Sequence, residues 1–153
     1  MKNRIALILG SVFYLGFIPG APGTYASIAT TIGFFLIFFF SHQIPPTLHL
    51  SAVCLISLTG VLASAAISDD TGIKDPSYVV IDEVAGQLVT FLFLPVSALN
   101  LVLGTIAFRF FDIWKPFPIR RLESLENGIG VMADDLLAGI YGNLVLQLIN
   151  ILL

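Results

Sequence analysis

Charged residues are scarce in this sequence, and cysteine, histidine and tryptophan are scarcer still. Asp, Glu, Lys and Arg together make up 11% of the 153 residues, whereas soluble proteins carry roughly a quarter. Hydrophobic residues make up 57%, and the mean hydropathy is +0.97. This composition excludes an ordinary soluble domain, and no hydrophilic stretch is long enough to form a second one. We therefore expect residues 1–153 to form a single integral-membrane domain.

The scarce residue types also exclude several kinds of chemistry. Seven Lys and Arg residues with a net charge of −3 provide too little positive charge to bind the phosphate backbone of a nucleic acid. The single cysteine, Cys54, cannot form an intrachain disulfide and lies in an apolar run. His42 and His49 flank a segment without charge. We expect none of these three side chains to act as a nucleophile or a catalytic base.

The few charges that are present lie close together in the sequence. Every charged residue falls within residues 2–4, 69–83 or 109–135, and the segments between and after them are apolar or neutral. Charge inside a bilayer is costly, so these three segments are expected to meet at one membrane face. The chemistry of the protein is expected at that face.

Long apolar runs predict the membrane-crossing helices, because a helix satisfies its backbone hydrogen bonds internally in lipid. Asp75 followed by Pro76 is typical of an N-cap and a first helical residue, and Pro95 and Pro116 are typical of helix ends. The predicted fold is an all-α, polytopic membrane bundle of about five transmembrane helices. Their expected ranges are residues 26–40, 47–67, 76–94, 101–115 and 131–153.

The N-terminal apolar run, residues 5–17, follows Lys2 and Arg4 and superficially matches a secretory signal. Another apolar segment follows at once, so we expect the run to be retained. As a helix it would measure about 20 Å, which is too short for the hydrocarbon core. We predict a short re-entrant or interfacial helix here.

Basic residues predict the orientation of the bundle, since they concentrate in cytoplasmic loops. With the helices given above, all the basic residues that lie in loops or at the N-terminus fall on one side, whereas residues 41–46 and 95–100 on the other carry no charge. The charged face is therefore expected to be cytoplasmic. The basic residues concerned are Lys2, Arg4, Lys74, Arg120 and Arg121.

Two pairs of adjacent carboxylates lie at the charged ends of predicted helices. A charge within a membrane segment costs about 2.5–3.5 kcal/mol, so four uncompensated carboxylates would be expensive and a cation is expected among them. Oxygen ligands without His or Cys suit Mg²⁺. Alternatively, the carboxylates are solvated at the interface and complement helix dipoles. The four are Asp82, Glu83, Asp134 and Asp135.

Small residues near each acidic pair allow the two pairs to converge. Gly86 follows the first pair and Gly139 follows the second. Glycine lets two helix backbones approach closely in a membrane. We therefore expect the two acidic helix ends to come together.

Cations are placed to complement these acids. Arg109 and Asp112 are three residues apart and share a helix face, and Lys115 follows. A guanidinium and an ammonium suit phosphate recognition; the alternative is a local ion pair together with anchoring at the positive membrane face. A Pro-Gly turn at residues 21–23 delivers Thr24 to a helix start, where free amides favour an anion. An ordinary N-cap is the alternative for Thr24.

In these motifs and in their order, nearly the whole sequence resembles the bacterial phosphatidylglycerophosphatase A family. The most specific segments are residues 108–119, FRFFDIWKPFPI, and 128–139, GIGVMADDLLAG. Residues 80–83, VIDE, and 21–24, APGT, support them. The resemblance implies a multi-pass enzyme of the bacterial inner membrane. Such an enzyme removes the terminal phosphate from phosphatidylglycerophosphate, with Mg²⁺, to give phosphatidylglycerol.

Combined with the residue patterns, this resemblance leads to a mechanistic hypothesis. The four carboxylates would hold one or two Mg²⁺ ions that polarise the phosphate and activate the attacking water. Arg109 and Lys115 would neutralise the phosphate oxygens. Asp112 would orient Arg109 or add a ligand, and Asp75 is a weaker candidate because an N-cap role suffices for it.

Three other classes of protein fit the sequence less well. A small ion or proton transporter also carries intramembrane carboxylates, but its charges would be distributed through the membrane depth. A lipid-headgroup transferase of the CDP-alcohol class would need an acidic motif that is absent. A scaffold subunit leaves the polar motifs unexplained. Oligomeric state is not indicated by the sequence.

Overall fold

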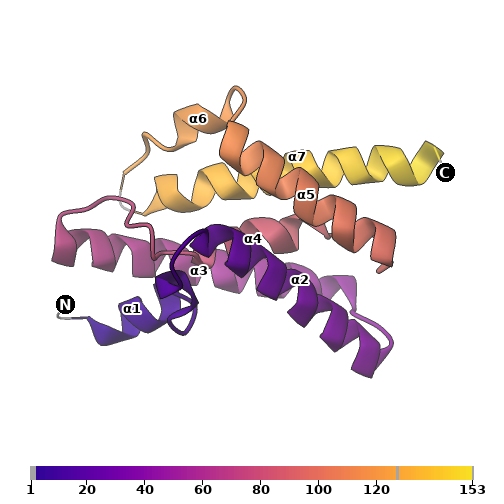
Figure 1. Ribbon diagram of the computed structural model, residues 1–153, viewed down its shortest axis with the longest axis horizontal. Coiled ribbons are helices and arrows are strands. Elements are labelled where there is room, and N and C mark those ends of the chain that lie inside the picture. Colours follow the sequence, from indigo (N-terminus) through magenta and orange to yellow (C-terminus); the bar gives the residue numbers. More distant parts are fainter. Residues whose placement is uncertain (1–2, 127, 153) are drawn as a thin grey trace.

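All the regular elements that the computed structural model describes, over residues 3–126 and 128–152, are helices (Figure 1). The all-α prediction is thus confirmed. In chain order the elements are α1 (Arg4–Gly10), η1 (Leu15–Phe17), α2 (Pro22–Ser41), α3 (Pro46–Thr71), α4 (Ile81–Thr90), α5 (Ala98–Trp114), α6 (Ile119–Leu122) and α7 (Ile129–Leu152).

Three of these helices are long and apolar enough to cross a membrane. They are α2, α3 and α7, with 20, 26 and 24 residues. Helix α5 has 17 residues, about 25 Å at the usual rise, and the hydrocarbon core is about 30 Å thick. The predicted number of about five spans is therefore larger than the number found in the described residues.

The main correction concerns α4, which was expected over residues 76–94 but contains 10 residues. Its N-cap is Val80, so the prediction that Asp75 caps the helix and Pro76 begins it is wrong. The preceding residues pack on the N-terminal segment instead. The Val80 amide donates to the Gly10 carbonyl at 2.9 Å, and the Tyr78 backbone lies directly against Gly16. These tertiary contacts outweigh the local helix-start signal.

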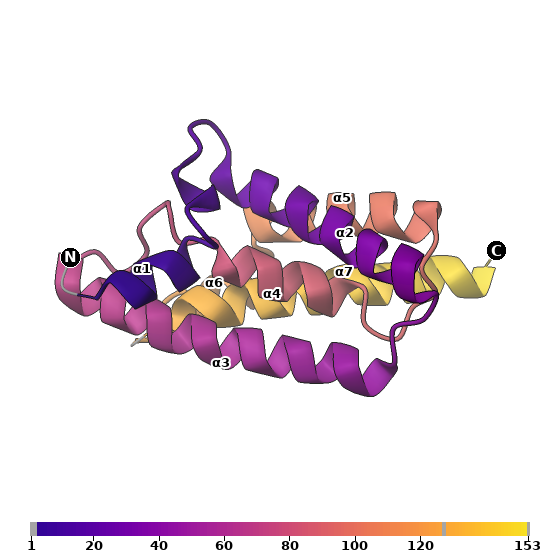
Figure 2. The ribbon, with the colours of Figure 1, turned by 90° about the horizontal axis from the view of Figure 1, so that it is seen from below.

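Helix α4 lies at the centre of the bundle (Figure 2), where it packs against α2, α3, α5 and most extensively α7. A short helix in this position does not need to reach both membrane faces, because neighbouring helices shield its backbone from lipid.

The N-terminal segment does not cross the bundle. Helix α1 is followed by three residues with positive φ, Val12, Phe13 and Tyr14, which reverse the chain into η1. At seven residues, α1 rises about 10 Å. This agrees with the prediction of a short N-terminal helix that fails to span.

Charged segments gather at one end of the bundle, and the uncharged loops lie at the other (Figures 1 and 2). The Asn3 amide donates to Asp70 Oδ2 at 3.0 Å, and Lys74 Nζ donates to the Glu123 carbonyl at 2.5 Å. These bonds join segments far apart in sequence and confirm the expected meeting of the charged segments. Lys2, which was assigned to this side, lies outside the described residues.

Candidate functional site

Close packing of α4 on α7 creates the site. A Cβ atom added at Gly86 would lie 2.6 Å from the Asp135 carbonyl and 2.5 Å from the Phe108 ring, and one added at Gly139 would collide with the Gly86 carbonyl. The two helices therefore approach as closely as glycine allows. The predicted convergence of the acidic helix ends is confirmed.

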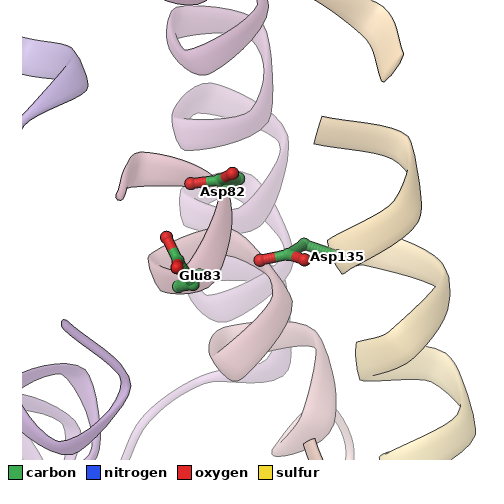
Figure 3. A group of neighbouring side chains, drawn as sticks. All are labelled: Asp82, Glu83 and Asp135. Carbon is green, nitrogen blue, oxygen red and sulfur yellow. The ribbon is translucent and has the colours of Figure 1, made fainter. Parts of the chain in front are cut away.

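Three carboxylates meet where these helices touch. Asp82 and Glu83 project from the first turn of α4, and Asp135 points toward them from α7 (Figure 3). One oxygen of each lies within 4.8 Å of the others. Asp82 and Asp135 are buried and Glu83 is half-buried. These three residues form the acidic cluster.

Each member of the acidic cluster keeps one buried oxygen without a hydrogen-bond partner among the described residues. The atoms are Asp82 Oδ1, Glu83 Oε2 and Asp135 Oδ2. Burying unpaired carboxylate oxygens side by side is unfavourable unless a cation joins them. The donor set consists of oxygen alone, which fits a hard divalent cation such as Mg²⁺.

The acidic cluster lines a pocket of about 250 Å³ that is strongly negative. Six carboxylates face one lysine there, and the remaining walls come from the α2 turn and the loop before α4. The lining residues are Pro22, Gly23, Asp75, Ser77, Val79, Asp82, Glu83, Asp112, Lys115, Asp134 and Asp135.

Asp134, the fourth predicted metal ligand, lines the pocket but lies outside the cluster of three oxygens. Its Oδ2 accepts a hydrogen bond from Lys115 Nζ at 2.7 Å, while Oδ1 is buried without a partner in the described chain. Burial alone would lower the pKa of Lys115, but its hydrogen bonds to Asp134 and Glu123 raise that pKa above its usual value. The ammonium is therefore held charged at the pocket wall.

Arg109 is the second cation at the site, as predicted. Its Nη1 lies 2.7 Å from Asp112 Oδ2 and 3.7 Å from Glu83 Oε1, so it connects the i,i+3 ion pair on α5 with the acidic cluster. The side chain is 17% exposed. Asp112 thus fixes the guanidinium beside the cluster.

The turn before α2 closes the pocket on another side. A Cβ atom at Gly23 would collide with Glu83 Oε1, so a larger residue there would displace the Glu83 carboxylate from its observed position. The N-cap of α2 is Ala21, which makes Thr24 the third helical residue and removes the N-cap alternative for it. Thr24 lines a neighbouring groove between α2 and α5 rather than the acidic pocket.

Sequence reasoning missed two polar residues near the site and underrated a third. Glu123 pairs with Lys115 at 2.5 Å, and no local signal indicated this loop contact. Gln87 is fully buried, and both polar atoms of its amide lack a partner within the residues described; its i,i+4 spacing from Glu83 was the available signal. Asp75 lies at the pocket mouth, where partial burial of its carboxyl group and the charge of Asp134 raise its pKa.

Comparison with known proteins is consistent with this geometry. The family described as Phosphatidylglycerophosphatase A matches residues 8–150. A Haemophilus influenzae protein named Phosphatidylglycerophosphatase A is 40% identical over 141 residues, covering 90% of this chain and 84% of its own. The Escherichia coli protein of the same name is 31% identical over 146 residues, with 91% and 83% covered.

A third relative carries a different name. This Bacteroides thetaiotaomicron protein, provisionally named a phosphatidylinositol-3-phosphatase, is 33% identical over 144 residues, covering 90% of this chain and 88% of its own. No solved structure matches the chain. The site described above therefore has no experimental counterpart among these comparisons.

Proposed function

The chain belongs to the phosphatidylglycerophosphatase A family, and we propose that it hydrolyses phosphatidylglycerophosphate to phosphatidylglycerol and phosphate with the help of Mg²⁺. It is a membrane phosphatase with a phospholipid substrate. The transporter alternative loses its main support, because the buried acids gather at one end of the bundle beside two cations.

The acidic cluster is the observation that carries the magnesium part of the proposal. One oxygen of each of the three carboxylates lies within 4.8 Å of the others, and each carboxylate has a buried oxygen without a partner in the described part of the chain. Asp82, Glu83 and Asp135 would hold the ion, whereas Asp134, which accepts a hydrogen bond from Lys115, would hold that lysine at the pocket wall. A bound Mg²⁺ supplies Lewis-acid polarisation of the phosphate and activation of water.

The remaining residues bind and orient the phosphate. In the hydrolysis, a water oxygen bonds to phosphorus while the bond from phosphorus to the glycerol oxygen breaks, and that oxygen takes up a proton. Negative charge grows on the phosphate oxygens, which Lys115 and Arg109 can neutralise. Asp134 holds Lys115 at 2.7 Å and Asp112 holds Arg109 at 2.7 Å. Both cations are thus positioned before the substrate arrives.

The proposed reaction takes place at the cytoplasmic face of the bacterial inner membrane. Lys74 at the charged end donates to the carbonyl of Glu123, which directly follows α6, the short helix that contains Arg120 and Arg121. Basic residues in the segments between membrane helices favour the cytoplasmic side. A phospholipid headgroup lies at this interface while its acyl chains stay in the bilayer. The acidic pocket and the headgroup would therefore lie at the same depth in the membrane.

Phosphate release from phosphatidylglycerophosphate by the purified protein in detergent tests the proposal. We expect release with Mg²⁺, none with EDTA, and restoration when Mg²⁺ is added back. Phosphatidic acid and phosphatidylinositol 3-phosphate serve as competing substrates, the latter because of the name of the Bacteroides relative. No release with any divalent cation would contradict the function, and release in EDTA would contradict the metal.

A further inference from the structure

A second hollow lies beside the acidic pocket, between the first turns of α2 and the second half of α5. We call it the α2–α5 groove. Its volume is about 730 Å³, within the range of about 300–1,000 Å³ that is usual for small-molecule sites. The walls are mainly apolar and include Ile28, Ile106, Phe110, Ile113 and Trp114.

The groove opens away from the bundle core. These five apolar side chains are all exposed. Ile28 lies on α2, a helix able to cross a membrane, and the other four lie on α5, which packs against α2. In a bilayer an exposed apolar surface contacts lipid chains, so the groove is open to the hydrocarbon region rather than to water.

Part of the groove wall is polar and adjoins the acidic pocket. Arg109 and Thr24 line the groove, and the guanidinium of Arg109 also contacts Asp112 and Glu83 on the pocket side. In α2, Gly23 lines the pocket and the next residue, Thr24, lines the groove. The hollows are therefore neighbours separated by Arg109 and the α2 turn.

We propose that the α2–α5 groove binds an acyl chain and the adjoining glycerol of the phospholipid substrate, with Thr24 at its phosphodiester group and Arg109, on the wall shared with the acidic pocket, between its two phosphate groups. This inference rests on the proposed function. The substrate has a phosphodiester near its acyl chains and a phosphomonoester at its far end. With the phosphomonoester in the acidic pocket, the phosphodiester lies at the shared wall and the chain extends along the groove. The groove thus selects lipid phosphates over soluble ones.

Substrate selectivity measures the contribution of the groove. The ratio of kcat/KM for diacyl phosphatidylglycerophosphate to kcat/KM for its deacylated, water-soluble form should fall about tenfold in Ile28→Trp, since a poorly fitting group in an apolar site costs about that much. Ile140→Trp on α7 is the matched control, because Ile28 and Ile140 are 45% and 46% exposed and Ile140 does not line the groove. The control should keep the wild-type ratio.

Binding is measured independently of turnover. Trp114 is the only tryptophan of the chain and lines the groove. Bromine atoms on a lipid chain that binds in the groove should therefore quench the fluorescence of Trp114. In EDTA, brominated phosphatidylglycerophosphate should quench Trp114 at a lower mole fraction than brominated phosphatidylcholine does. Arg109→Gln should reduce this difference.

The outcomes separate the groove from the proposed function. Equal quenching by the two lipids would overturn the proposed role of the groove even if the wild-type protein releases phosphate. The same selectivity ratio in Ile28→Trp as in Ile140→Trp would also overturn it. Selective quenching without phosphate release would support the groove as a phospholipid-binding site and would contradict the proposed hydrolytic function.

Discussion

At the uncharged end of the bundle polar side chains bond to one another or to the backbone, whereas at the charged end several buried carboxylates keep one oxygen without a partner among the described residues. Asn100 and Asn150 exchange hydrogen bonds at 3.2 and 2.8 Å, and His49 Nε2 donates to the Leu88 carbonyl at 3.0 Å. Asp82 and Asp135 each keep an unpartnered buried oxygen, counted over the described residues.

This difference separates polar groups whose hydrogen bonds stabilise the bundle from polar groups that have no partner of their own within the described residues. A buried polar group normally finds a partner within the protein, because leaving it unpaired costs free energy. The pairs at the uncharged end follow that rule and need nothing further. The acidic cluster departs from it, and a departure of this kind is expected where a bound cation or substrate completes the interactions.

The largest effect is expected from removing a charge from the acidic cluster. Asp135→Asn should lower kcat by at least about 100-fold, as removal of a key electrostatic group does. It should not lower the thermal unfolding midpoint in EDTA, because it relieves repulsion between buried carboxylates. Phosphate release and circular dichroism in detergent measure the two quantities.

Asp134→Asn provides the contrast within the same pocket. It too should abolish turnover without unfolding the protein, since it releases Lys115, but Mg²⁺ should still raise its unfolding midpoint. In Asp135→Asn that rise should be lost. Near-full activity of Asp135→Asn would contradict the proposed metal site, and near-full activity of Asp134→Asn would contradict the proposed role of its pair with Lys115. An equal Mg²⁺ response in both variants would contradict their different assignments.

An intermediate effect is expected at the contact that brings the acids together. Gly86→Ala should destabilise the protein by about 1–3 kcal/mol, because an added methyl group forces α4 and α7 apart, and activity should fall with it. Gly33→Ala is the control, since a Cβ atom there has no neighbour within 4 Å. Equal unfolding midpoints for the two variants would show that the close approach has no energetic importance.

The smallest effect is expected at the uncharged end. Asn150→Leu removes a partner of Asn100 and should cost about 0.6–1.7 kcal/mol, the size of an interhelical hydrogen bond in a membrane. Activity should stay at the wild-type level because the change is far from the acidic pocket. Gln147→Leu, which removes a bond within α7 alone, should change stability less. Loss of activity in Asn150→Leu would mean that the two ends are coupled.

Much of the site could be predicted because its residues are unusual in an apolar chain. Asp82, Glu83, Arg109 and Asp112 were assigned from charge and spacing, and the structure places them together. The pairing of Asp134 with Lys115 could not be predicted. Spacing within one helix does not say which of two adjacent carboxylates faces a neighbouring helix and which faces a loop.

The sequence by itself determined the all-helical membrane architecture, because hydrophobicity and helix formation are properties of local segments. It also determined that the charges would gather at one end, since a bilayer excludes them elsewhere. Tertiary structure decided the length of α4, through the bond from Val80 to Gly10, and the choice of partners around Lys115. It also created the α2–α5 groove. These features depend on distances between segments far apart in the chain, and such distances are fixed only when the helices pack.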